Sequence, residues 1–182
     1  MTFTQDVKNT IVSVIKGADD IVSALRDVVK NQVVGSLKDV KEIGTATLDI
    51  VADVVSGAIS AAEEVGLTVL DVAKESVSSA VLAVSEVGGN VITASVKAVS
   101  GAITGAAGVG GDVGKVAVVA VETAIKESSK LGKDTAEVAK QTAVGAVKTA
   151  SQLGEETGKA VKEALLSAAS LPHDIIESAL KG

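Results

Sequence analysis

The residues best suited to chemistry in this chain are few and scattered. His173 is the one histidine and there is no cysteine, so neither a multi-histidine metal site nor a Cys/His pair can form. The acidic pairs Asp19-Asp20, Glu63-Glu64 and Glu155-Glu156 have the charge to attract Ca²⁺, but they lack the alternating oxygen ligands and the central glycine of a calcium loop. We therefore interpret His173 as a helix-start residue and the acidic pairs as solvated charge.

A glycine-rich segment, Gly-Val-Gly-Gly-Asp-Val-Gly over 108–114, is superficially similar to a phosphate-binding loop. It lacks both the Gly-Lys-Ser/Thr ending and the spacing of a dinucleotide-binding motif. The whole chain has one Phe and no Trp, Tyr or Cys, so it is short of the side chains that build catalytic pockets. We expect a protein that is not an enzyme, with no catalytic residue, cofactor or metal site.

The overall composition limits the partners that this chain can have. Its 182 residues carry a net charge of −6, and no basic cluster is present to neutralise the phosphates of a nucleic acid. The longest run without a charge covers residues 98–111 and is too short to span a bilayer. The N-terminus lacks the basic and apolar regions of a secretory signal, and the absence of cysteine fits a reducing compartment. We expect a cytoplasmic protein without a transmembrane span, either in solution or peripheral to a membrane, droplet or granule.

An internal repeat is the strongest signal in the sequence. Glycines follow one another at 22-residue intervals, and halving this period gives an 11-residue column from Ile11 to Ile176 without a polar member. Five of the eleven columns together hold only one charged residue, Arg26. Because eleven residues make three helical turns, these columns share one face of an α-helix. The sequence therefore predicts an amphipathic helix with a continuous apolar face.

The 11-residue register continues from Val7 to Leu180 without insertion or deletion. This favours one long helix, or helices whose turns consume whole repeats. It predicts an all-α fold, a long helix or a long helical hairpin over 1–170, with straight to right-handed packing. The segment 101–114 has six glycines and is either a hinge or a zone of close contact. Pro172 suits a first helical turn, so a short C-terminal helix is expected within 171–182.

The middle of the apolar face alternates between small and larger residues. This alternation predicts a knob and a notch for hydrophobic contact at each repeat. The predicted contact residues are Val33, Gly44, Val55, Gly66, Val77, Gly88, Val99, Gly110, Val121, Gly132, Gly154 and Leu165. A second small-residue series lies on the polar back of the helix and suggests a second contact face. Tandem duplication of a 22-residue unit would also produce both series, without selection for small residues at these positions. The members of the second series are Gly35, Gly57, Ser79, Gly101, Thr123, Gly145 and Ser167.

A column of lysines borders the apolar face. Its members are Lys8, Lys30, Lys41, Lys74, Lys140 and Lys162. Such lysines can lay their methylenes along an apolar surface and place their ammonium groups in water or among head groups. The alternative reading is that they form ordinary ion pairs on a solvated face.

In texture and period, stretches such as Glu86-Val87-Gly88-Gly89-Asn90-Val91-Ile92-Thr93 and Lys148-Thr149-Ala150 resemble amphipathic-repeat proteins that coat lipid. These proteins are the synucleins, the perilipins and the exchangeable apolipoproteins, with the phasins of polyester granules similar in role. The Lys-Thr-Lys-Glu-Gly-Val core of synucleins and the proline punctuation of apolipoproteins are absent. The resemblance implies a helical coat on a lipid surface.

Two functions follow from this pattern. The first is a coat or stabiliser that lays its Val/Ala/Gly face on a lipid or other hydrophobic surface. The second is a structural protein that self-assembles into a bundle or filament through the same face. The expected partners are therefore a hydrophobic surface or copies of the same chain, with a homo-oligomer in the absence of lipid. In the second case, leucine at Gly66, Gly88 and Gly132 would disrupt the assembly by steric overlap.

Overall fold

A computed structural model of the chain describes residues 2–181, and every regular element among them is an α-helix. The all-α prediction is therefore confirmed, whereas the prediction of one long helix or hairpin is wrong. The described residues form nine helices: α1 (Phe3–Ile15), α2 (Ile21–Leu37), α3 (Asp49–Ser60), α4 (Val69–Glu86), α5 (Val91–Gly108), α6 (Val113–Lys130), α7 (Thr135–Leu153), α8 (Glu155–Ser167) and α9 (His173–Lys181).

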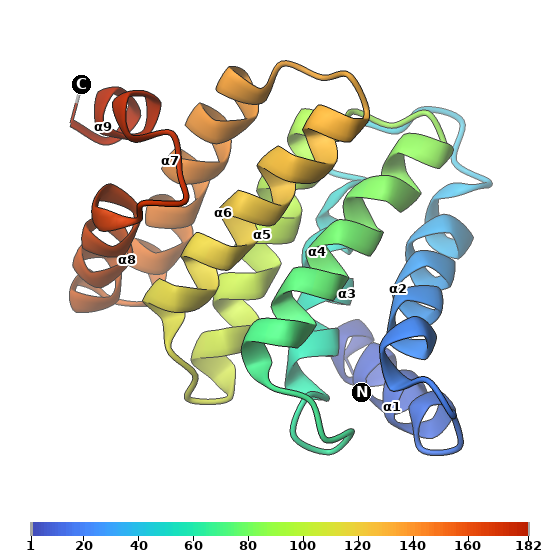
Figure 1. Cartoon of the computed structure of the whole chain (residues 1–182). Helices are drawn as coiled ribbons and strands as arrows, with labels where there is room; N and C mark the ends of the chain where they lie inside the picture. The colour runs from blue at the N-terminus through green and yellow to red at the C-terminus, as the bar shows by residue number, and fades with distance from the viewer. Residues whose placement is uncertain (1, 182) are drawn as a thin grey trace.

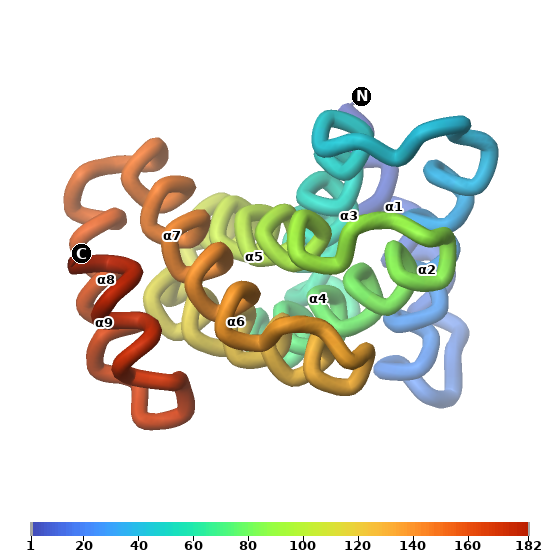
Figure 2. The backbone as a smooth tube through the Cα atoms, turned by 90° about the horizontal axis from the view of Figure 1, so that it is seen from above, coloured from blue at the N-terminus to red at the C-terminus, as the bar shows by residue number. Residues whose placement is uncertain are grey.

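The helices alternate between two layers (Figures 1 and 2). Helices α1, α3, α5, α7 and α9 pack side by side in one layer, which we call the odd layer, and α2, α4, α6 and α8 form the even layer. Consecutive helices also contact each other across the layers. Each helix therefore packs mainly against neighbours one and two places away in the chain, as in an α-solenoid.

Glycine ends the helices of the central repeats. Gly66, Gly88, Gly110 and Gly132 have φ between +71° and +79°, the left-handed region that glycine adopts most readily. The residue after each of them donates its amide to a carbonyl five residues back, at 2.8–3.0 Å. This is the Schellman arrangement, which satisfies carbonyls at the helix end.

A capping side chain begins the next helix two residues after each of these glycines. Thr68, Asn90, Asp112 and Asp134 accept the amide hydrogen of the residue three places on, at 3.0–3.1 Å. Helices α4 to α7 consequently start at intervals of 22 residues. Eighteen helical residues and a four-residue turn fill one 22-residue interval in α4, α5 and α6, so a turn does not interrupt the 11-residue register.

The first three helices and the last two depart from this spacing. Positions 24 and 46, where a cap would fall, hold alanine; α2 instead begins after the Asp20 cap, and α3 follows Leu48 with no side-chain cap. At the other end α8 stops at Ser167, and α9 begins directly after Pro172, within the segment where a short terminal helix is expected. In the segment 101–114, Gly101 to Gly108 are helical and the turn lies at Gly110.

Candidate functional site

The predicted contact column is divided between two environments. Its larger members Val33, Val55, Val77, Val99, Val121 and Leu165 are at most 1% exposed and form the core between the layers. Its glycines lie in the turns or the α2–α3 loop: Gly66, Gly88, Gly110 and Gly132 as described above, Gly44 in the loop, and Gly154 in extended backbone between α7 and α8. The apolar face is thus already covered within one folded chain.

The turn glycines do not act as notches. A Cβ built on Gly44, Gly66, Gly88, Gly110 or Gly132 would meet no atom within 4 Å. These glycines are explained by backbone conformation at the four positive-φ sites, rather than by close approach of a neighbouring helix.

The second small-residue series makes the close helix contacts. A Cβ on Gly57 would lie 2.7 Å from the Thr4 carbonyl oxygen, and one on Gly145 would lie 2.9 Å from Val96 Cγ1. A Cβ on Gly101 would overlap the Ala52 backbone, 2.8 Å from its Cα. Each glycine therefore faces the preceding helix of the odd layer and lets the two backbones approach.

In the even layer, the members of the same series differ in burial, and Ser167 at the end of α8 is exposed. Ser79 and Thr123 are 7% exposed on the even-layer helices α4 and α6. Gly35 occupies the equivalent place on α2 but is exposed, with no atom within 4 Å of a Cβ built on it. Gly35 thus marks the free end of the even layer, where no earlier helix packs.

The six border lysines are dispersed over the fold. Lys8 pairs with Glu64 at 2.8 Å and Lys30 pairs with Glu86 at 3.2 Å, in each case between helices or their flanking turns. Lys41, Lys74 and Lys140 are exposed, and Lys162 is half-buried. The folded chain therefore does not present these lysines as a single row.

Ion pairs on the surface connect neighbouring helices and shift the pKa values of Arg26 and Glu64. The hydrogen bond and charge of Glu75 on α4 raise the pKa of Arg26 on α2, and Lys8 lowers the pKa of Glu64. Lys97 on α5 pairs with Asp49 on α3 at 2.5 Å. Partial burial and the Asp49 carboxylate raise the pKa of Asp53. The ion pairs Arg26–Glu75, Lys8–Glu64 and Lys97–Asp49 each join elements of the same layer.

Buried hydroxyl groups are satisfied mainly within their own helices. Ser76, Ser95 and Thr142 donate to the carbonyl oxygens four residues back, at 2.6–2.8 Å. Hydroxyl contacts between helices also occur, at 3.4 Å for Ser95–Ser128 and 2.8 Å for Ser100–Thr149. Among the described residues, no buried side-chain nitrogen or oxygen lacks a partner.

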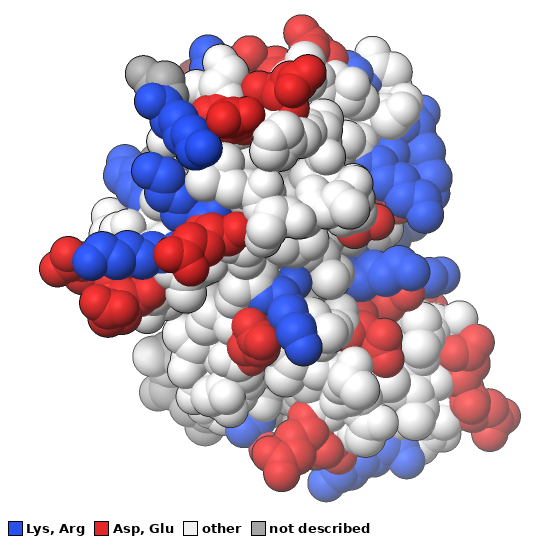
Figure 3. All heavy atoms as spheres, turned by 60° about the vertical axis from the view of Figure 1, so that its left-hand side comes forward, with Lys and Arg blue, Asp and Glu red and all other residues white. Residues whose placement is uncertain are grey.

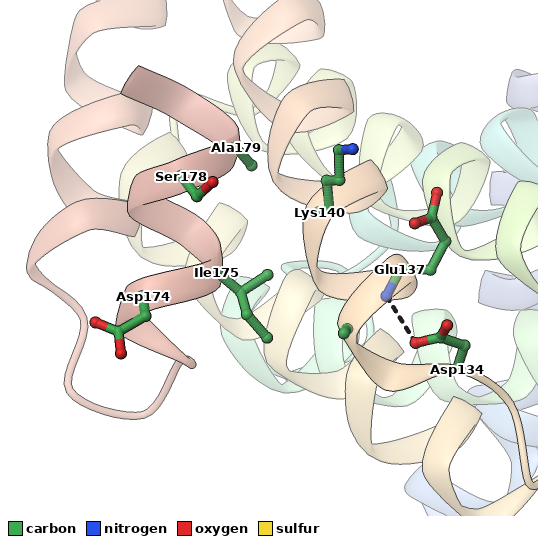
Figure 4. Close-up of a pocket in the computed structure, with 8 residues that line it drawn as sticks. Asp134, Glu137, Lys140, Asp174, Ile175, Ser178 and Ala179 are labelled. Carbon is green, nitrogen blue, oxygen red and sulfur yellow. Dashed lines mark hydrogen bonds between the residues drawn. The ribbon is translucent and has the colours of Figure 1, made fainter. Parts of the chain in front are cut away.

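A hollow with a volume of about 690 Å³ lies between α7 and α9 (Figure 4). Asp134, Glu137 and Lys140 line it from α7 and the preceding turn. Asp134 is occupied as the cap of α7, and Glu137 accepts a hydrogen bond from Gln141 at 2.7 Å. In Figure 4 the Asp174 carboxylate points away from these groups. The described residues contain no group of three or more potential metal ligands, so the hollow is best explained as the seam of a terminal helix.

Charges of both signs are interspersed on the surface. On the face shown in Figure 3, acidic and basic side chains lie beside one another with uncharged surface between them. By length and composition, α5 is the one described helix that could cross a membrane, and 56% of it is buried inside the folded chain. Such burial is typical of a core helix.

No family model matches this chain, and no curated protein matches it.

Proposed function

We propose that this chain is a non-enzymatic coat protein that is closed in water and opens on a hydrophobic surface, where it lays its apolar helix faces on lipid. The closed form hides these faces between two layers, and the open form turns them outward. This proposal combines the amphipathic pattern of the sequence with a fold in which that pattern is internally covered.

The observation that carries the proposal is the self-sufficiency of each helix. In the central repeats, a side chain caps the start of the helix and a glycine turn satisfies its end. Buried hydroxyls such as Ser76 and Thr142 donate within their own helix. Separating the layers therefore breaks few polar contacts, and a helix can move to another apolar surface without leaving buried polar groups unpaired.

The contacts between the layers are of a kind that lipid can replace. Most of the buried residues are valine and alanine, together with a smaller number of leucines and isoleucines. Packing of this type is favourable because apolar area leaves water, and a lipid surface provides the same benefit. A Cβ built on Gly66, Gly88, Gly110 or Gly132 would meet no atom within 4 Å, so no neighbouring element packs against these turns at that point.

The ends of the solenoid favour a coat over a filament. At the N-terminal end, Gln32 and Asp39 of α2 and its flanking turn occupy positions equivalent to the buried Ser76 and Ala83 of α4. Polar residues at an outer face are typical of a capping repeat, which stops further stacking. At the C-terminal end, α9 lies out of the repeat spacing and covers α7.

A reversible cross-link tests the opening step. The chain has no cysteine, so the double variant Ser95→Cys/Ser128→Cys would carry one defined pair between α5 and α6, where the two hydroxyl oxygens are 3.4 Å apart. Binding to phosphatidylcholine vesicles is measured by flotation before and after reduction. We expect the reduced form to bind as wild type does and the oxidised form to lose binding. Ser95→Cys alone, under the same oxidising conditions, is the control.

Two results would contradict the proposal. Failure of the wild-type chain to bind vesicles would exclude a coat on this surface. Equal binding by the oxidised and reduced forms would show that the layers do not separate. Helix content is not a useful measure, because the closed form is already helical.

A further inference from the structure

An apolar groove lies on the outer side of the even layer, separate from the faces that opening would expose. It has a volume of about 550 Å³ and runs between α4, α6 and the end of α8. Its lining includes Leu70 of α4, Val118 of α6, Ala164 of α8 and Ala168 just after α8. Leu70 is 37% exposed, so its side chain is available to a ligand.

The groove exists because α8 ends early. The helix stops at Ser167, and Ala168 is extended, with φ −74° and ψ 116°, so the chain leaves α6 at this point and crosses to the odd layer. Beneath the groove, α6 and α8 lie close together because both residues at the contact are small: a Cβ on Gly114 would be 3.2 Å from Ala164 Cβ. The result is a narrow apolar floor with open sides.

A positive charge lies at the edge of this groove. Lys115 on the first turn of α6 lines the groove and is exposed, and we find no carboxylate of the described residues in an ion pair with it. The nearby Asp112 is engaged as the helix cap, accepting the Lys115 amide at 3.1 Å. An apolar cleft with one cation at its edge matches a molecule that has a hydrocarbon tail and an anionic head.

We propose that this groove binds one single-chain anionic amphiphile, a fatty acid, with its hydrocarbon tail along Leu70 and Val118 and its carboxylate at Lys115. The size of the groove lies in the range of small-molecule sites and suits one chain. Binding uses the closed form and does not rest on the proposed opening.

Calorimetric titration with octanoate, decanoate and laurate, below their micelle concentrations, tests the site. We expect one molecule per chain and an affinity that rises about fourfold for each methylene buried. Dodecyltrimethylammonium, which has a cationic head and a tail one methylene longer than that of laurate, should still bind at least tenfold more weakly. Equal binding of the two amphiphiles would refute the role of Lys115, and the absence of saturable binding would refute the site.

Matched variants locate the bound molecule. Lys115→Glu is expected to weaken laurate binding at least tenfold, and Leu70→Ser several-fold. Lys126→Glu makes the same charge change on an exposed lysine one 11-residue repeat further along α6, and should leave binding unchanged. Equal losses in Lys115→Glu and Lys126→Glu would mean that general surface charge, rather than this groove, attracts the amphiphile.

The cross-linked variant separates this inference from the proposed function. Oxidised Ser95→Cys/Ser128→Cys should still bind laurate, because the link joins α5 to α6 away from the groove residues. Loss of laurate binding on oxidation would contradict binding to the closed form, whatever the result with vesicles.

Discussion

Two glycines of one 22-residue series, Gly35 and Gly101, are expected to respond to the same substitution with opposite signs. Both are helical and three repeat lengths apart. Gly35 has free space where a Cβ would be placed, whereas at Gly101 a Cβ would overlap the Ala52 backbone of α3. The pair therefore isolates the effect of helix contact from the effect of helix propensity.

The magnitudes follow from this geometry. Alanine is favoured over glycine in a helix by roughly 0.5–1 kcal/mol, so Gly35→Ala should raise the free energy of unfolding by about that amount. Gly101→Ala gains the same stabilisation from helix propensity, but it forces α3 and α5 apart, which costs about 1–3 kcal/mol. Because a backbone atom cannot rotate away, we take the upper part of this range and expect a net loss of about 1–2 kcal/mol.

The assay is urea unfolding followed by circular dichroism at the helix signal, since the chain has neither Trp nor Tyr as a fluorescent probe. In thermal melts, we expect a rise of about 1–4 °C for Gly35→Ala and a fall of about 2–8 °C for Gly101→Ala. A neutral or stabilising effect of Gly101→Ala would refute the close contact between α3 and α5. A destabilising effect of Gly35→Ala would show that something covers the outer side of α2.

Substitutions at three further positions test local features by the same unfolding assay. Gly88→Ala should cost about 1–2 kcal/mol because φ is +79°, and Gly88→Asn should cost less; equal losses would contradict a backbone explanation. Asp134→Ala should cost about 1 kcal/mol and speed hydrogen exchange of the Glu137 amide, whereas Asp134→Asn should keep the cap; unchanged exchange in the alanine variant would argue against it. The pKa of Asp53 is raised, so its contribution favours folding below the ordinary value of 3.8 and is lost as pH rises through the folded pKa. Asp53→Asn should therefore stabilise the chain at neutral pH and lose this advantage in acid. An advantage that grows as the pH falls would show that the pKa of Asp53 is lowered rather than raised.

The helical class could be predicted from the sequence because the absence of charge from five columns reflects burial of one helix face. This holds both for one long helix and for several shorter helices. The number of helices could not be predicted from that periodicity. Four-residue turns and eighteen-residue helices together preserve the 11-residue register, so the apolar columns continue through each turn. The overlooked signal is the pairing of a glycine with a capping residue two places later, as in Gly88 and Asn90 or Gly110 and Asp112.

The notch role predicted for the glycines of the central column was wrong for a similar reason, whereas glycines of the second series do make close helix contacts. Glycine serves both left-handed turns and close helix contacts, and a regular column of glycines does not distinguish these uses. Gly66 and Gly88 belong to turns, whereas Gly57 and Gly101 belong to contacts. In the predicted contact column, the valines are buried between the layers, whereas the glycines lie in turns or loops. The groove beside Lys115 had no sequence signal, since it arises from the early end of α8.

The alternation of layers restricts how this chain can change in length. Removal of one 22-residue unit ahead of α7 would transfer every later helix to the opposite layer, so Gly145 of α7 would no longer meet a helix of the odd layer. Removal of two units preserves the parity: without residues 91–134, α4 would lead directly into α7, and Gly145 would meet α3 in the place of Gly101. Natural or engineered variants of this architecture should therefore differ by steps of 44 residues.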